Sequence, residues 1–301
     1  MWLLFAFSGP VLWATSTHVD KYLVERYFKE GSVAVLMVFT AVMGLVTLPF
    51  IWWYQPGVLT LPLQSIAVMA ASGVLYMGAM YFYLQALQSE EASTVAPFFQ
   101  VTGLFGLALG FLILGERLTL MQVAGGVLVI AGSVLLSVRF AKGATRIKKR
   151  LILLMVSCSF ALAVSSVIFK YFAVRDEFWT TTFWNFAGEA LFGAALMVTR
   201  AHRAQFARML RQNTGAVLSI NAANELINLG GGLGMRYALL LAPLGMVQAV
   251  TSTGPFFVLF IGIGLSLFLP NLGREELSRT GFVQKVIATT FAVAGIILIN
   301  R

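Results

Sequence analysis

The chain has 301 residues, of which 59% are apolar and 11% are charged, against about 45–50% and about 25% in an average soluble domain. This composition excludes a soluble globular protein and leaves too few charged residues to coat an appended enzyme or receptor domain. The net charge of +9 would indicate nucleic acid in a soluble protein, but in a membrane protein excess Lys and Arg is expected in cytoplasmic loops. We therefore expect an integral membrane protein with no nucleic-acid partner.

Ten long apolar runs, separated by short polar breaks, follow one another along the chain. Most are close to the roughly 20 residues that a transmembrane helix needs. The predicted spans are residues 2–24, 32–53, 63–87, 92–114, 119–138, 151–173, 179–199, 215–240, 244–269 and 281–299. The first run lacks the basic start of a signal peptide, so we assign it to the first helix. Trp52, Trp53, Tyr54 and Trp179 stand at run ends, as is typical of rings at the lipid headgroups.

Lys and Arg residues are unevenly divided between the two sets of loops. Of the 21 in the chain, 16 fall on the side of the odd-numbered loops. The other five are Arg117, Lys170, Arg175, Arg236 and Arg301. The positive-inside rule therefore predicts a non-cytoplasmic N-terminus. The basic segments 139–150 and 200–211 would face the cytoplasm, either as orientation signals or in contact with anionic lipids.

The two halves of the chain repeat each other. Residues 7–26 resemble residues 156–175 at an offset of 149, and the block APFF at 96–99 returns as GPFF at 254–257. Because each copy has five spans, the second copy enters the membrane from the opposite face, which gives an inverted-topology repeat. We predict a first five-helix repeat at 1–140, a basic linker at 141–150 and a second five-helix repeat at 151–301.

A set of short motifs surrounds the turn between the fourth and fifth predicted spans. The motifs are Ala86-Leu87, Pro97, Leu114-Gly115-Glu116-Arg117-Leu118, Gln122, Gly125 and Gly132. Together with the duplication, they resemble the EamA family of the drug/metabolite transporter superfamily over nearly the whole chain. In the second half the Gly-Glu turn is replaced by LPNLGREELSRT at 269–280. The family is usually drawn with both termini in the cytoplasm, opposite to the orientation that the charge count predicts.

The resemblance implies a fold and a class of function. The fold is an all-α membrane protein with ten transmembrane helices, built as two inverted five-helix repeats around a central cavity. The function is a secondary active or facilitative transporter of a small metabolite, amino acid or drug-like solute. Alternating access of the two halves would carry the solute, with or without coupling to protons.

Two carboxylates lie deep within predicted spans, where charged groups are costly and usually face a cavity. Glu189 is near the middle of the seventh span, and Asn185 lies one turn earlier on the same face. Glu189 is either a substrate or proton site or a neutral carboxyl that holds helices together. Either role keeps it away from lipid.

The eighth span carries a polar stripe, with Asn221, Asn224, Glu225 and Asn228 at helical spacing on one face. The third span has Tyr76 and Ser72 at the equivalent positions of the other copy. These groups either line a wet cavity or join helices by hydrogen bonds. Glu225 is thus a second candidate for proton coupling.

Other polar groups near the spans have simpler expected roles. His18, near the end of the first span, is a candidate titrating group, and Gln248 is a candidate for cavity lining. Lys21 and Lys170 occupy equivalent positions in the two copies, and their side chains are expected to reach the headgroups. Glu116 is expected to stabilise the N-terminus of the fifth span.

The inventory of reactive groups is poor. Cys158 is the single cysteine and there are two histidines, so we expect no intramolecular disulfide, no metal site, no cofactor and no catalytic residues. No nucleotide-binding G-x-x-x-x-G-K-[ST] sequence occurs. A lipid or polyprenyl-carrier flippase of the same fold is the alternative function, ahead of an intramembrane hydrolase or transferase.

The expected partners follow from this function. They are a small-molecule substrate, protons if transport is coupled to them, and membrane lipids. Monomer and homodimer both stay open. The expected location is the bacterial inner membrane.

Overall fold

The computed structural model describes residues 1–27, 33–89, 95–137, 149–212, 215–268 and 279–300, and the regular structure within them is helical. The first-half helices are α1 (Trp2–Tyr27), α2 (Val33–Tyr54), the 3-10 helix η1 (Pro56–Leu59), α3 (Leu63–Ser89), the 3-10 helix η2 (Ala96–Gln100), α5 (Val101–Leu114) and α6 (Leu120–Ser137). The second-half helices are α7 (Lys149–Arg175), α8 (Phe178–Leu196), α9 (Arg200–Gln212), α10 (Ala216–Leu241), α11 (Leu244–Thr251), α12 (Gly254–Phe268) and α13 (Arg279–Ile299). Most predicted spans coincide with one helix whose ends lie within a few residues of the prediction.

The fourth and ninth predicted spans are interrupted, which corrects the expectation of continuous helices there. The fourth begins as η2 before α5, and the ninth is divided into α11 and α12. Pro255, near the start of α12, has no amide hydrogen to continue a helical ladder. The hydroxyls of Ser252 and Thr253 at the break donate back to the carbonyls of Gln248 and Val250. The blocks APFF and GPFF therefore mark a change of helix in both halves.

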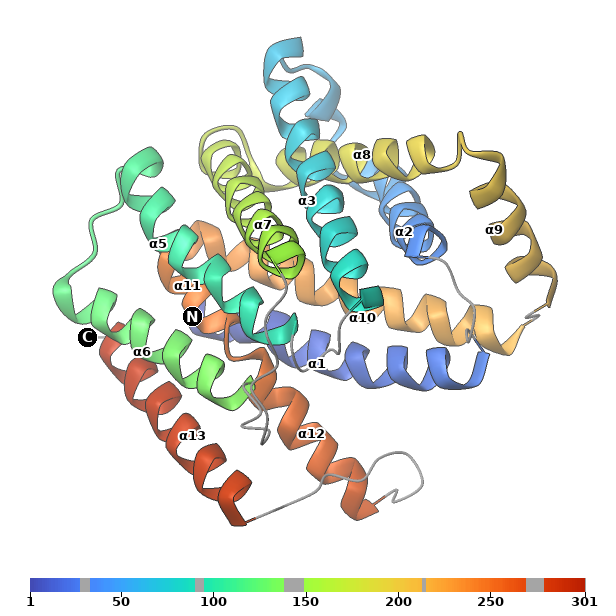
Figure 1. The fold of residues 1–301 in the computed structure, drawn as a ribbon. Helices are drawn as coiled ribbons and strands as arrows, with labels where there is room; N and C mark the ends of the chain where they lie inside the picture. Colours follow the sequence, from blue (N-terminus) through green and yellow to red (C-terminus); the bar gives the residue numbers. More distant parts are fainter. Residues whose placement is uncertain (28–32, 90–94, 138–148, 213–214, 269–278, 301) are drawn as a thin grey trace.

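Helix α9 was not expected, because the segment 200–211 lacks a long apolar run. Its sequence is amphipathic instead, with Arg residues interrupted by a few apolar ones. Phe206 packs on Phe39 of α2 at a centroid distance of 5.3 Å, and His202 Nδ1 lies 2.9 Å from the Leu196 carbonyl. In Figure 1 the helix joins α8 to α10 at one end of the molecule and runs across the direction of α10.

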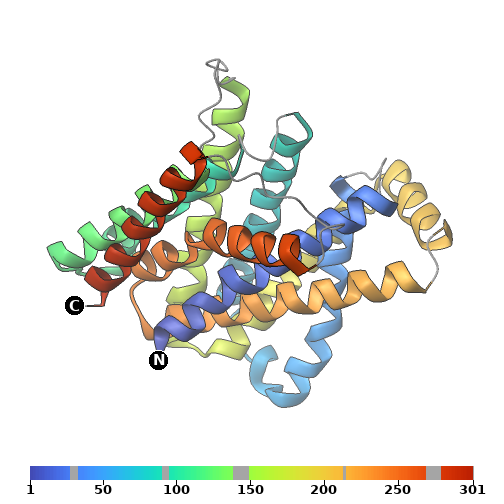
Figure 2. The same ribbon diagram turned by 90° about the horizontal axis from the view of Figure 1, so that it is seen from below.

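Helices of the two halves pack extensively on each other, and α3 of the first half packs on α8 as well as on α7. Helix α1 lies along α10, and α3 lies along α7. Helices α6 and α13 pack together at the edge of the molecule, and α2 packs on α8 (Figure 1). The start of α1 and the end of α13 lie on the same side of the molecule in both views (Figure 2). An even number of membrane crossings would place the two ends in this way.

Large apolar side chains cover much of the surface, and a set of polar side chains is buried in an interior that is otherwise apolar. Exposed large side chains include Leu4, Phe50, Phe111, Leu153 and Leu191. Buried polar side chains include Ser72, Thr181, Asn185, Glu189, Asn224 and Gln248. Among the described residues, the segments long and apolar enough to cross a membrane are Met37–Tyr54, Leu63–Ala86, Lys149–Arg175 and Leu244–Leu265. Apolar segments of this length facing outward identify an integral, multi-pass membrane protein.

Candidate functional site

A buried ion pair joins α8 to α10. Nη2 of Arg236 on α10 lies 2.7 Å from Oε1 of Glu189 on α8, and it donates to Oδ1 of Asn185 at 2.5 Å. Glu189 and Asn185 are one turn apart on α8, so one guanidinium nitrogen reaches both. The side chains of Arg236 and Glu189 are 13% and 4% exposed. Two opposite charges buried this deeply depend on each other, because either one alone would lose its hydration without compensation.

Hydrogen bonds extend this pair to α3 and α7. Asn185 Nδ2 donates to the Ser72 hydroxyl at 2.7 Å, and Ser72 donates in turn to the Met69 carbonyl. Ser165 of α7 donates to the Ser72 carbonyl at 2.8 Å. We call Arg236, Glu189, Asn185 and Ser72 the Arg236 centre. It connects the first-half helix α3 with the second-half helices α8 and α10, and Ser165 adds a contact from α7.

A close approach of two backbones makes these contacts reachable. At Gly73 on α3, a methyl group would overlap the Asn185 carbonyl, and at Gly188 on α8 it would overlap the Ala70 carbonyl. Two glycines facing each other let α3 and α8 approach more closely than ordinary side chains allow. This approach brings Ser72 within hydrogen-bond distance of Asn185.

Aromatic rings surround the guanidinium. Its Cζ atom lies 4.6 Å from the ring centroid of Phe186, 5.5 Å from that of Phe169 and 5.9 Å from that of Tyr76. Ring faces attract a cation, and the attraction grows when water is excluded. The rings therefore hold Arg236 in place and cover it with apolar surface.

Three predicted site residues meet in this region. Glu189 and Asn185 are partners of Arg236, and Tyr76 lies beside it. Arg236 itself was missed, because the charge count treated it as a loop residue, and that assignment was wrong. Its spacing of 11 from Glu225, about three helical turns, was the available signal, since it places Arg236 on the polar face of α10.

The predicted polar stripe of α10 turns largely inward. Asn221, Asn224 and Glu225 are buried, and Asn228 is half-buried. Thr40 of α2 donates to Glu225 Oε1 at 3.3 Å. The stripe thus faces the protein, as expected, and Glu225 contacts α2.

His18 and Gln248 make contacts outside the Arg236 centre. His18 Nε2 lies 3.1 Å from the Val258 carbonyl, which links α1 to α12. Gln248 of α11 is buried against Gly106 of α5, and its amide atoms have no hydrogen-bond partner among the described residues. The sequence candidates are therefore distributed over several helix contacts.

A second buried ion pair lies between the halves. Lys170 Nζ on α7 is 2.6 Å from Glu116 Oε1, and it donates to the Ala242 carbonyl at 2.5 Å. Glu116 Oε2 accepts the amide of Leu244 at 2.8 Å. Both side chains are largely buried. The expectation that Lys170 reaches the headgroups was wrong, because its ammonium group binds a carboxylate and a carbonyl within the protein. Lys21 lies outside the residues whose side chains the structure describes.

The role expected for Glu116 was right in kind but assigned to the wrong helix. Its carboxylate binds the first amide of α11, where a negative charge is favoured, and not the start of α6. Helix α6 has its own cap, a capping box in which Thr119 and Gln122 exchange side-chain to backbone bonds of 3.2 and 3.0 Å. Gly115 supplies the positive φ of 67° that ends α5 before Glu116.

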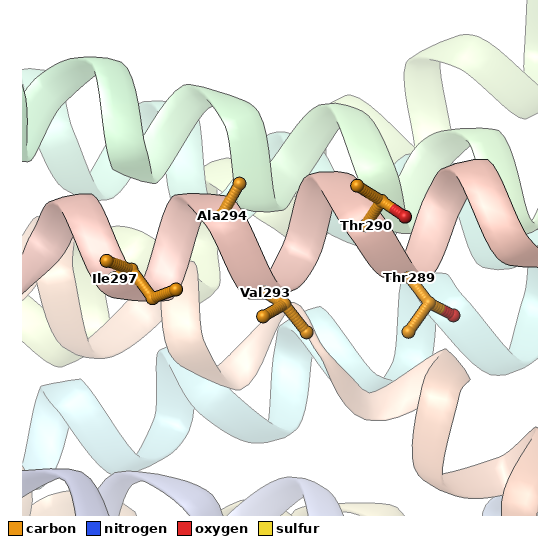
Figure 3. A pocket seen from close by; sticks show the side chains of 5 residues that line it. All are labelled: Thr289, Thr290, Val293, Ala294 and Ile297. Carbon is orange, nitrogen blue, oxygen red and sulfur yellow. The ribbon is translucent and has the colours of Figure 1, made fainter.

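The candidate site is not a metal centre within the part of the chain that the structure describes. Among the described residues, no group of three or more His, Cys, Asp or Glu side chains could hold a metal ion. A surface hollow runs along α13 and is lined by Thr289, Thr290, Val293, Ala294 and Ile297 (Figure 3). It belongs to one helix, has no charged lining residue, and includes none of the candidate residues.

Comparison with known proteins agrees with the motifs. Residues 1–138 match the model of the EamA-like transporter family, which confirms the resemblance to this family. No curated protein matches the chain. A solved structure described as "Crystal structure of protein" covers 100% of this chain and 98% of its own, with a TM-score of 0.71 and 17% sequence identity. That similarity shows the fold alone.

Proposed function

We propose, from the membership of residues 1–138 in the EamA-like transporter family, that this chain moves a small solute across a membrane by alternating access. The observation that carries the proposal is the ion pair of Arg236 and Glu189, which is buried between two second-half helices and is connected to the first half by the hydrogen bond from Asn185 to Ser72. Charged groups inside a membrane are costly and usually serve substrates or protons. The Arg236 centre is therefore the proposed substrate and coupling site.

The helix packing supports an inverted repeat of residues 1–140 and 151–301 joined by a basic linker at 141–150. If α1, α2, α3 and α6 correspond to α7, α8, α10 and α13, the pair α1 with α10 is the counterpart of the pair α7 with α3. Two further pairs, α2 with α8 and α6 with α13, join corresponding helices. A pseudo-two-fold axis in the membrane plane would produce this pattern.

One difference between corresponding contacts supports alternating access. Helix α3 packs extensively on α8, whereas the corresponding contact of α10 with α2 is sparse. Gly73 and Gly188 allow the first contact to be close, and Thr40 donates a hydrogen bond to Glu225 across the second. In the proposed mechanism the two halves exchange these arrangements, so that α10 closes on α2 as α3 separates from α8. The structure then represents one end state of the cycle.

The ion pair of Lys170 and Glu116 holds the two halves together in this end state. Glu116 belongs to the first half, and its partners Lys170 and Leu244 belong to the second. Separation of the halves at this end of the molecule must break both contacts. These contacts therefore contribute to the free-energy difference between the two end states.

The proposed orientation keeps the N-terminus outside the cytoplasm, in a bacterial inner membrane. Lys170 and Arg236 are buried in ion pairs, so they no longer count as loop charges. Three cations then remain on the side of the N-terminus, against 16 on the side of the odd-numbered loops. The charge asymmetry of the sequence is therefore stronger than the first count gave.

The test is transport in proteoliposomes. The purified protein is reconstituted with a pH-sensitive dye inside, without an imposed voltage, and screened with amino acids, sugars, organic cations and organic anions. A substrate-dependent pH change that is lost in Glu189→Gln and kept in Asp176→Asn would support coupling at Glu189. Asp176 is the matched control because it is an exposed carboxylate just before α8.

Two other results are decisive. If a labelled solute equilibrates without a pH change, the protein is a facilitator or exchanger. If no compound moves while the protein is folded, solute transport is refuted.

A further inference from the structure

Helix α9 concentrates positive charge at one end of the molecule. It carries four arginines and no acidic residue. Arg200, Arg203, Arg208 and Arg211 are all exposed. Within the part of the chain that the structure describes, none of the four forms an ion pair. The helix therefore presents four guanidinium groups to its surroundings.

The four arginines share one side of the helix. At 3.6 residues per turn they occupy an arc of about 140°, and two exposed alanines are the other residues within it. Arg200 and Arg203 are neighbours at i and i+3 on this arc, as are Arg208 and Arg211. We call these four residues the arginine face of α9.

This placement is more specific than a signal for membrane orientation requires. Such a signal depends on the number of cations in a loop, not on their alignment on one face. Neighbouring cations on one face repel each other, which weakens the helix. An anion between them removes the repulsion, and paired guanidinium groups suit the several acceptor oxygens of a phosphate.

The opposite side of α9 is attached to the rest of the protein. Phe206, which lies outside the arginine arc, packs on Phe39 of α2. His202 contacts the Leu196 carbonyl at the end of α8. These two contacts fix the rotation of the helix about its axis. The arginine face is therefore held outward before any partner binds.

The neighbours of α9 place it at the membrane surface. Phe39 lies near the start of the membrane-spanning segment Met37–Tyr54, and the apolar Val198, just before α9, is 75% exposed. The helix joins α8 to α10 and runs across the direction of α10 (Figure 1). An amphipathic helix that lies along the end of a span, instead of crossing the membrane, meets the lipid headgroups.

We propose that the arginine face of α9 binds the phosphate groups of anionic phospholipids, with the pairs Arg200/Arg203 and Arg208/Arg211 as the contacts. Position favours lipid over an acidic protein, because headgroups surround the ends of the spans whereas a protein would have to be recruited. The inference goes beyond solute transport and does not depend on it.

The test measures which lipid gathers at α9 in the full-length protein. Ala204→Cys introduces a thiol within the arginine face, at an exposed position. A fluorophore attaches there selectively, because Cys158 is completely buried. The labelled protein is reconstituted in phosphatidylcholine vesicles, and quenching by phosphatidylglycerol with a nitroxide near its headgroup is compared with quenching by the matching phosphatidylcholine.

Phosphatidylglycerol should associate with this position about ten-fold more strongly than phosphatidylcholine, since each arginine near an anionic group contributes about five-fold. High salt should remove most of the preference by screening. Equal quenching by the two lipids at low salt overturns the proposal.

Variants locate the contacts. Arg200→Gln/Arg203→Gln should lose part of the preference for phosphatidylglycerol, and the variant with all four arginines replaced by Gln should lose all of it. Lys149→Gln/Arg150→Gln is the matched control, because it removes two exposed cations from the start of α7. An equal loss in this control would mean that net charge alone attracts the lipid, which overturns the site.

A further variant keeps the charge and changes its placement. Ala201→Arg/Arg203→Ala preserves the composition of α9 but separates the first arginine pair. It should lose as much of the preference as Arg200→Gln/Arg203→Gln does. If it binds as the wild type does, the pair is not the contact and the assignment fails.

An acidic polypeptide provides the competing outcome. Poly-glutamate is added to the labelled protein in detergent, and its binding is followed through the same fluorophore. If poly-glutamate binds through the four arginines while phosphatidylglycerol shows no preference in vesicles, the face serves an acidic protein and the lipid proposal is overturned.

Discussion

Removing Arg236 alone from its ion pair with Glu189 should destabilise the protein more than removing both charges. Arg236→Gln leaves Glu189 buried at 4% exposure without its cation and takes the donor from Asn185 Oδ1. The expected loss of unfolding free energy is about 3–5 kcal/mol. Glu189→Gln should cost less, about 1–3 kcal/mol, since an amide oxygen can still accept from Nη2.

The double variant separates pairing from packing. In Arg236→Gln/Glu189→Gln two neutral amides face each other, so no charge is stranded, and the loss should be smaller than that of Arg236→Gln alone. The sum of the single losses should exceed the double loss by at least about 2 kcal/mol, within the range of coupling for residues in direct contact.

The assay uses the single cysteine. Cys158 lies on α7 and is completely buried, so its reaction with a thiol reagent reports opening of the helix bundle. Labelling is measured against the mole fraction of a denaturing detergent, with Arg175→Gln as an exposed control expected to change stability by less than about 0.5 kcal/mol. Additive single losses, or an Arg236→Gln loss below about 1 kcal/mol, would refute the coupled ion pair.

Three further predictions concern a close helix contact, the second ion pair and the cap of α6. Gly188→Ala should lower stability by about 1–3 kcal/mol or more, because its methyl group meets the Ala70 carbonyl. Gly78→Ala on α3, which meets nothing within 4 Å, should be neutral or stabilising in the same unfolding assay. Lys170→Met strands Glu116 and should cost about 3–5 kcal/mol, while Lys170→Met/Glu116→Gln recovers most of it in the labelling assay. A double variant as unstable as Lys170→Met alone would contradict a stabilising ion pair between Lys170 and Glu116. Thr119→Ala should cost about 1 kcal/mol through loss of the capping box, measured by the same titration, and no change would show that Gln122 caps α6 alone.

Much of the architecture could be predicted because the membrane restricts it. Apolar length, loop charge and end-of-helix aromatics are local properties of the sequence, and a lipid solvent converts them into spans. Periodicity also placed Glu189 and Asn185 on one face of α8, and in the structure both side chains accept hydrogen bonds from Nη2 of Arg236. The change of helix near GPFF had a local signal as well, since Pro255 cannot donate to the helical ladder.

The partners of the polar groups could not be predicted from these local signals. Helical spacing says which face a residue occupies, but not which helix covers that face. Arg236 and Lys170 were assigned to loops and headgroups, because a cation near a span end usually reaches water. The structure buries both, because acceptors from distant segments meet them: Glu189 at a separation of 47 residues and Ala242 at a separation of 72.

The sequence by itself determined that the chain is a helical membrane protein whose residues 1–138 match the EamA-like transporter family, with polar groups concentrated in α8 and α10. Only the tertiary structure decided which of those groups form a site. The physical reason is that the close approach of α3 and α8 depends on Gly73 and Gly188 meeting across the helix contact. The pairing of Arg236 with Glu189 likewise depends on the folded chain bringing the two charges together where water hydrates neither of them.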